Sequence, residues 1–453
     1  MLTPARNHVH PPVSSGAGEM GLLIPEAGRG TPRTPHPTDE TYPSSTPSTI
    51  IFRPAGAPEK RVPTLVRLRP ASESGQMINL FSVDDHIIEP PGVWQDRVPQ
   101  KYKAAAPQVR EESDGTQYWT YEDTREATMG LNAVAGKPIE TWGLEPRRFD
   151  DMIPACYDPV ARAQELLSQG VCASVAFPSL PRFGGALFAS FKDKELAAAC
   201  VRAWNDFVLD EWCPAGPRGL YVPMTIAPLW DPQAAAAELH RCVAKGAKAI
   251  CLPENSAPLG LPSYWQADWD PLWRAVTETG VPACMHIGSS GQLYAGSADS
   301  SFAVPIATMA VASWVCAVDI SLSPVFAKFP DVQIVWSEGG IGWVPAALER
   351  ADRQWERHRY WSHLPNDVLP SEVFRRNFTF CMIEEPWGLE QRGRVGVDRI
   401  VWEADFPHAD TPYPHTQKIV AELFAGVSAD DTAAITHGNA ERLFGWEMAE
   451  LPA

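Results

Sequence analysis

Short apolar segments alternate with helix-like segments along most of this 453-residue chain, and eight of the apolar segments have the composition of buried β-strands. Helices between consecutive strands are typical of parallel sheets, because each connection must carry the chain back to the end where the next strand starts. Eight such units predict a single-domain α/β fold, a (β/α)8 TIM-like barrel. The expected strands lie within 81–91, at 173–177, 220–224 and 249–252, within 280–288, and at 332–340, 378–382 and 399–403.

The first of these strands ends in polar residues, because Asp84, Asp85 and His86 follow its apolar start. Alternate side chains of a strand share a face, so Asp84 and His86 point one way and Asp85 points the other way. A carboxylate oxygen and an imidazole nitrogen at this spacing can reach one Zn²⁺ or Mn²⁺ ion. The pattern therefore predicts half of a metal site, and the alternative is an Asp/His pair that caps a turn.

Three later strands also carry a polar group where they end. His286 lies in "CMHIG", Glu338 follows the apolar run "VQIVWS", and Asp405 ends the strand in "WEADFPH". Catalytic groups of a (β/α)8 barrel lie at the C-terminal ends of its strands. We therefore expect His286 and Asp405 to complete the metal site of Asp84 and His86. The alternatives are a core histidine bonded to the backbone and an aspartate that caps a turn.

With these motifs in place, the sequence resembles the amidohydrolase-related branch of the metal-dependent amidohydrolase superfamily, which includes aminocarboxymuconate-semialdehyde decarboxylase. The resemblance rests on the first-strand Asp-x-His, on "CMHIG" and "WEADFPH", and on the C-terminal "ITHGNAERLFGW", and it covers about residues 78–447. It implies a metal-dependent enzyme that forms a homodimer. In binuclear members a carbamylated lysine ends the fourth strand, whereas Lys248 here precedes that strand and Glu254 follows it. One divalent ion is therefore expected, Zn²⁺ in first place and Mn²⁺ as the alternative.

The resemblance also suggests roles for single residues. Glu338 stands where the related decarboxylase has a histidine, so it is expected to bind the metal, act as a base or pair with a cationic substrate group; the alternative is a turn carboxylate. Asp405 is the expected proton-transfer residue, Glu403 lies on its face one layer deeper, and His408 is expected to orient a neighbour or to belong to the loop. Arg182, after the second strand, is a candidate anchor for a substrate carboxylate, because its guanidinium matches that group. The alternative for Arg182 is a surface ion pair.

Two reactions fit such a site. The first is non-oxidative decarboxylation of a small aromatic or unsaturated carboxylic acid, in which Asp405 protonates the carbon that loses CO₂. The second is metal-assisted hydrolysis of an amide, ester or lactone, in which Asp405 removes a proton from the attacking water. The resemblance and the 17 tryptophans favour decarboxylation, and Glu338 favours hydrolysis. A third interpretation is a binding protein that has kept the barrel without its chemistry.

Composition limits the partners and the compartment. A formal net charge of −17 argues against nucleic acid and anionic membranes as partners, since both attract clustered Lys and Arg. No apolar run reaches the roughly 18 residues that a membrane span requires. The nine cysteines have no CxxC spacing, which favours reduced buried thiols in a cytoplasmic protein. The expected partner is a small-molecule substrate.

Two segments fall outside the strand and helix alternation. Residues 1–75 are rich in Pro, Ser and Thr without periodicity, which predicts a disordered extension; Met77 is an alternative start of translation. Residues 92–157 form an insertion after the first strand, with a hairpin expected in 117–130. An insertion at that end of a barrel strand is expected to lie over the mouth of the active site and to help form the substrate pocket.

Overall fold

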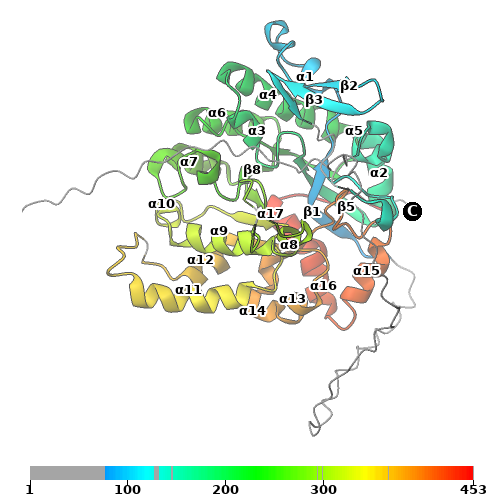
Figure 1. Cartoon of the computed structure of the whole chain (residues 1–453). Helices are drawn as coiled ribbons and strands as arrows, with labels where there is room; N and C mark the ends of the chain where they lie inside the picture. Colours follow the sequence, from blue (N-terminus) through cyan, green and yellow to red (C-terminus); the bar gives the residue numbers. More distant parts are fainter. Residues whose placement is uncertain are drawn as a thin grey trace, which may run out of the picture. The chain divides into compact units, whose positions relative to one another are not determined.

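The computed structural model describes residues 77–126, 132–143, 146–292, 294–297, 299–365 and 367–451. The extension expected at 1–75 lies outside these residues. Figure 1 shows strands surrounded by helices in the described part of the chain. None of the helices in this part is long and apolar enough to cross a membrane.

Eight consecutive parallel strand positions form the barrel that the sequence predicts. The third position is divided at Pro223 into two short pieces, β6 and β7, of which β6 pairs with β5 and β7 pairs with β8. The eighth strand, β12, returns to the first, β1, through a bridge between Asp85 and Phe406. The strands are β1 (Leu80–Ile87), β5 (Val171–Pro178), β6 (Tyr221–Val222), β7 (Met224–Thr225), β8 (Ala249–Pro253), β9 (Ala283–His286), β10 (Ile334–Ser337), β11 (Phe378–Met382) and β12 (Ile400–Trp402).

Capping residues set the starts of the helices that follow the strands. Asp158, Asp193 and Asp231 each accept backbone N–H groups of the first turn, and a proline stands at the first position of two of these helices. The longer helices are α2 (Pro159–Ser168), α4 (Lys194–Phe207), α6 (Pro232–Ala244), α7 (Asp270–Thr279), α9 (Ala310–Leu322), α11 (Val344–His358), α12 (Pro370–Asn377), α15 (Thr416–Leu423) and α17 (Asn439–Phe444). Short helices are α1 (Gly92–Gln95), α3 (Ala186–Ala189), α5 (Cys213–Ala215), α8 (Ala303–Ala307), α10 (Val325–Lys328), α13 (Pro386–Glu390), α14 (Arg392–Val395) and α16 (Ala429–Ala433).

The insertion after β1 has two parts. Its first part is the antiparallel sheet β2 (Gln108–Glu111), β3 (Gln117–Tyr121) and β4 (Thr124–Glu126), which contains the expected hairpin. This sheet packs through Trp119 on Trp94 of α1, with ring centroids 5.4 Å apart. In its second part, the N–H groups of Val134 and Ala135 donate to the carbonyl of Pro407, just after β12. The second part of the insertion therefore reaches the C-terminal end of the barrel, as expected.

The core is apolar and rich in aromatic side chains. The strands are buried along their whole length, which explains their nearly continuous apolar sequence. Trp204 and Trp212 are both buried, and the nine cysteines are all free thiols. The polar side chains buried at the strand ends are therefore exceptions in an otherwise apolar interior.

Candidate metal centre

Polar side chains converge where β1, β9, β10 and β12 end. Asp84 and His86 belong to β1, His286 is the last residue of β9, Glu338 follows β10 and Asp405 follows β12. Glu338 and Asp405 have backbone φ angles of 55° and 49°, in the left-handed region that non-glycine residues seldom occupy. Strained residues of this kind cluster at functional sites, where the surrounding structure holds them in place.

Neighbouring donor atoms of the cluster are 3.1 to 3.4 Å apart. The Nε2 atom of His86 lies 3.3 Å from Oδ1 of Asp84 and 3.1 Å from Oδ1 of Asp405. The Nε2 atom of His286 lies 3.4 Å from Oδ2 of Asp84 and 3.2 Å from Oε2 of Glu338. The structure thus brings all five side chains together, although they come from strands far apart in the sequence.

These close contacts are not hydrogen bonds. Both carboxylate oxygens of Asp84 and Asp405 and the Nε2 atoms of His86 and His286 are buried without a hydrogen-bond partner. Buried polar atoms are normally paired, so a cluster without partners is costly unless a cation binds it. No described Lys or Arg forms an ion pair with these carboxylates. The donor set therefore fits a divalent metal ion.

Burial also determines which of these side chains are protonated when no ion is bound. Burial raises the pKa of Asp84 well above its usual range, and the carboxylates of Glu403, Asp405 and Glu338 raise it further. Burial lowers the pKa of His286 to about 3, and it lowers the pKa of His86 well below its usual range. Both imidazoles are therefore neutral at pH 7, which is the form that binds metals.

The donors form two overlapping groups. Asp84, His86 and His286 offer atoms within 4.8 Å of one another, and His86, Asp405 and His408 do the same. His408 stacks on His86 with ring centroids 3.7 Å apart, and its Nδ1 lies 3.0 Å from Oδ1 of Asp405. The structure thus places three of the expected ligands in one group and Asp405 in the next. That all four share one ion stays a prediction.

The surrounding backbone fixes the orientation of His286. Its Nδ1 atom lies 2.6 Å from the carbonyl oxygen of Ile287. In the neutral imidazole this contact places the proton on Nδ1, so that Nε2 keeps a free lone pair. The lone pair points to the atoms of Asp84 and Glu338 described above, as a ligand requires.

Glu403 is joined by hydrogen bonds to Glu338 and Cys381. Its Oε2 accepts the backbone N–H of Glu338 at 3.1 Å, and it forms a side-chain hydrogen bond with Cys381. Burial raises the pKa of Glu403 well above its usual range. The carboxylate thereby holds the strained backbone of Glu338, so Glu338 faces His286 rather than capping a turn.

Arg182 lies away from these contacts. Its side chain is about half exposed, and its guanidinium forms an ion pair with Glu126 of the insertion at 3.5 Å. This surface pair is the alternative that the sequence left open. The role of Arg182 as a substrate anchor stays a prediction.

Sequence reasoning missed the supports on the opposite face of β1. Asp85 accepts the Ser174 hydroxyl on β5 and the N–H of Phe406 after β12, so it joins three strands below the metal centre. Arg162, fully buried on α2, donates through Nη2 to the carbonyl of His86 at 2.6 Å. The sequence contained a signal that Arg162 is buried. Arg162 lies next to Ala163 and four residues before Leu166, on the apolar stripe of that helix.

The sequence is similar to enzymes that act on aromatic acids. A family model described as amidohydrolase matches residues 108–446, which include His286, Glu338 and Asp405 but begin after β1. The γ-resorcylate decarboxylase of Polaromonas sp. (strain JS666) is 25% identical over 266 residues, covering 56% of this chain and 78% of the relative. The γ-resorcylate decarboxylase of Rhodococcus jostii is 28% identical over 281 residues, with the same two coverages.

Solved structures show the same fold. An amidohydrolase from Mycobacterium avium subsp. paratuberculosis matches with a TM-score of 0.65 at 22% identity, covering 81% of this chain and 99% of the other. The dihydroxybenzoic acid decarboxylase of Polaromonas sp., solved with bound manganese and the inhibitor 2-nitroresorcinol, matches with a TM-score of 0.52 at 18% identity, covering 81% and 97%. Since the family model covers more than half of the chain, and the barrel and its metal-binding side chains agree with it, the chain belongs to the amidohydrolase family and is an enzyme.

Proposed function

We propose that the protein catalyses the metal-dependent, non-oxidative decarboxylation of a small aromatic carboxylic acid. The observation that carries this proposal is the cluster of buried donor atoms without hydrogen-bond partners at the C-terminal ends of three strands, β1, β9 and β12. The similarity to two γ-resorcylate decarboxylases supports the reaction type.

In this proposal Asp84, His86 and His286 hold the ion, and Asp405 joins them from β12. A bound divalent cation supplies positive charge that binds the substrate carboxylate and stabilises negative charge as the reaction proceeds. Carboxylate and imidazole donors suit both Zn²⁺, the first expectation, and Mn²⁺. The manganese in the Polaromonas structure supports including Mn²⁺ in every metal test.

Asp405 is the proposed proton-transfer residue. In decarboxylation the bond between the ring carbon and the carboxyl carbon breaks, CO₂ leaves, and a proton takes its place on the ring carbon. Burial and the nearby charge of Asp410 raise the pKa of Asp405, which supports a carboxyl group that can carry this proton. Glu338, 3.2 Å from His286, is placed to bind the ion or to act as a base.

Arg182 would anchor a carboxylate only if its ion pair with Glu126 opens. An Arg182→Lys variant keeps the charge but loses the bidentate fork, so it separates charge from geometry.

The test compares acids with esters. Apoprotein loaded with Zn²⁺ or Mn²⁺ is incubated with a panel of hydroxybenzoic acids and their methyl esters, and CO₂, methanol and bound metal are measured. We expect CO₂ from one or more acids and no methanol. Methanol without CO₂ would instead support metal-assisted hydrolysis, and full metal content without turnover of any compound would support a binding protein.

His286→Ala is the matched variant for the metal site, with His240→Ala as its control. His240 is a half-exposed surface residue paired with Glu278, so its loss should leave metal content unchanged. His286→Ala should sharply lower both bound metal and CO₂ release, because it removes one of three grouped donors. Wild-type metal affinity in His286→Ala would show that the site is assigned wrongly.

We further propose a cytoplasmic homodimer. The nine free thiols support a reducing compartment. The outer face of α8 and α9 supports a dimer, because its apolar side chains Ile306, Val311 and Val315 are exposed.

A further inference from the structure

Phe183 lies on the connection that leaves β5 and packs against the imidazoles of the metal centre. Its ring centroid is 4.0 Å from that of His286, 4.8 Å from that of His86 and 6.0 Å from that of His408. Phe177, within β5, lies 5.0 Å from His286. Two phenyl rings therefore pack against the imidazoles of the proposed metal ligands.

The two phenylalanines differ in their exposure to solvent. Phe177 and the proposed ligands Asp84, His86 and His286 are fully buried, whereas Phe183 is 8% exposed. Phe183 is thus partly accessible to solvent, while its ring contacts the imidazoles of two proposed ligands.

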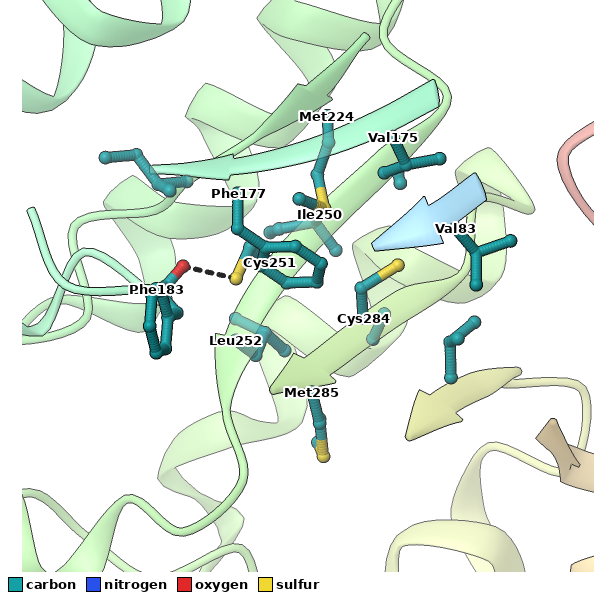
Figure 2. Packing of buried hydrophobic residues seen from close by; sticks show 14 of the residues in the cluster. Val83, Val175, Phe177, Phe183, Met224, Ile250, Cys251, Leu252, Cys284 and Met285 are labelled. Carbon is teal, nitrogen blue, oxygen red and sulfur yellow. Dashed lines mark hydrogen bonds between the residues drawn. The ribbon is translucent and has the colours of Figure 1, made fainter. Parts of the chain in front are cut away.

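Three supports hold this connection in place. The carboxylate of Glu89 accepts the N–H groups of Ser179 at 3.0 Å and Leu180 at 2.9 Å. The thiol of Cys251 on β8 donates to the carbonyl oxygen of Phe183, as the dashed line in Figure 2 shows.

The third support is a close approach of two backbones. Gly184 packs so tightly that an added Cβ would lie 2.7 Å from the backbone nitrogen of Pro253, so no other residue fits without a shift. With supports on both sides, the Phe183 ring has a fixed place beside the metal centre before any ligand binds.

We propose that Phe183 is the specificity-determining contact that binds the aromatic ring of the substrate. The inference rests on the proposed decarboxylation and deepens it. A fixed phenyl face favours a flat, apolar ring, because aromatic pairs gain from both area burial and ring geometry. It offers less to a linear unsaturated acid of the same charge. The pocket is therefore selective for monocyclic aromatic acids.

The test uses Phe183→Leu, with Phe183→Tyr to restore the ring and Phe191→Leu as the matched control. Phe191 precedes α4, is buried at 1% exposure and stacks on Tyr121 with ring centroids 5.1 Å apart. Each protein is loaded with Mn²⁺ and titrated calorimetrically with 2-nitroresorcinol. Bound metal, melting temperature, kcat and KM for the best hydroxybenzoate are measured in parallel.

We expect Phe183→Leu to keep its metal and to raise the Kd and KM roughly three- to tenfold, since it loses the ring contact. The Kd and KM of Phe183→Tyr and Phe191→Leu should stay within about twofold of wild type. A general loss of stability would not separate Phe183→Leu from these two variants in this way. Wild-type binding by a metal-loaded Phe183→Leu overturns this inference alone. A wild-type protein that binds no aromatic probe and releases no CO₂ overturns the proposed function and this inference with it.

Discussion

The proposed metal ligands are the part of the candidate site that the pattern of a single strand reveals. Asp84 and His86 share a face because strand side chains alternate, and their Nε2 to Oδ1 distance of 3.3 Å agrees with that expectation. His286 was predictable because it ends an apolar strand. Each residue needed only local sequence to be found.

At this scale the sharpest prediction concerns Asp405. Asp405→Asn keeps the shape of the side chain but cannot carry a proton, so kcat for decarboxylation should fall at least ~100-fold, as general acid catalysis typically contributes. Initial rates of CO₂ release and elemental analysis are measured on the same preparation, because Asp405 is also a proposed ligand. A variant that retains its metal and turns over within a few-fold of wild type would transfer the proton-transfer role to Glu338.

Residues that act across strands could not be predicted. Asp85 was expected only to point away from Asp84, and its partners Ser174 and Phe406 depend on which strands become neighbours. Arg162 lies on α2, and its contacts with the carbonyls of His86 and Cys156 tie this helix to β1. Arg182 shows the converse, because its chemistry suggested an anchor while its surroundings supply an ion pair.

Among the elements, strands were located better than the segments that connect them. β11 agrees with the expected 378–382. Between β9 and β10 the chain forms three helices, α8, α9 and α10, separated near Thr308 and Ser323. The third strand is broken at Pro223, because proline has no N–H for the ladder. Periodicity reports burial, whereas these breaks depend on how neighbouring elements pack.

The connection after β5 leads to a prediction about pH. Burial raises the pKa of Glu89 to about 7, although Ser179, Leu180 and Trp204 donate to it. A carboxyl whose folded pKa is raised stabilises the fold most below its unfolded pKa of about 4.5, and this contribution is lost as pH rises through 7. Glu89→Gln cannot ionise, so it does not lose stability in this way.

The unfolding free energy of wild type relative to Glu89→Gln should therefore fall by roughly 3 kcal/mol between pH 4.5 and pH 8, at about 1.4 kcal/mol for each unit of pKa shift. Urea unfolding of both proteins at several pH values measures this difference. A difference that stays constant with pH, or grows as pH rises, would contradict the assigned cause.

At the scale of the whole molecule, α8 and α9 expose apolar side chains that would be in contact with water in a monomer. Val311 and Val315 are four residues apart and share a face, and Ile306 of α8 is 45% exposed. Apart from Asp319, which accepts the indole N–H of Trp265, α9 carries no charged side chain. On a chain of net charge −17, such a face suits another copy of itself.

Val315→Asp should convert the proposed homodimer into a monomer, because it places a charge in an apolar interface. Val160→Asp is the control, since Val160 is similarly exposed on α2, outside this face. Light scattering after size-exclusion chromatography gives both masses. A wild-type monomer at micromolar concentration, or a Val315→Asp dimer, would exclude this face as the interface.

The place where the barrel closes has a consequence for how the protein matures. Asp84 and Asp405 stand on the two strands that meet last, and the backbone N–H of Asp405 donates to the carbonyl of Asp84 at 2.8 Å. The bridging residues Asp85 and Phe406 are 321 positions apart. If Asp405 is a ligand as proposed, a ribosome-bound chain without β12 lacks one ligand, so full loading of the ion would wait until synthesis of the barrel is complete. On this proposal, metal content would depend on whether the last strand has docked.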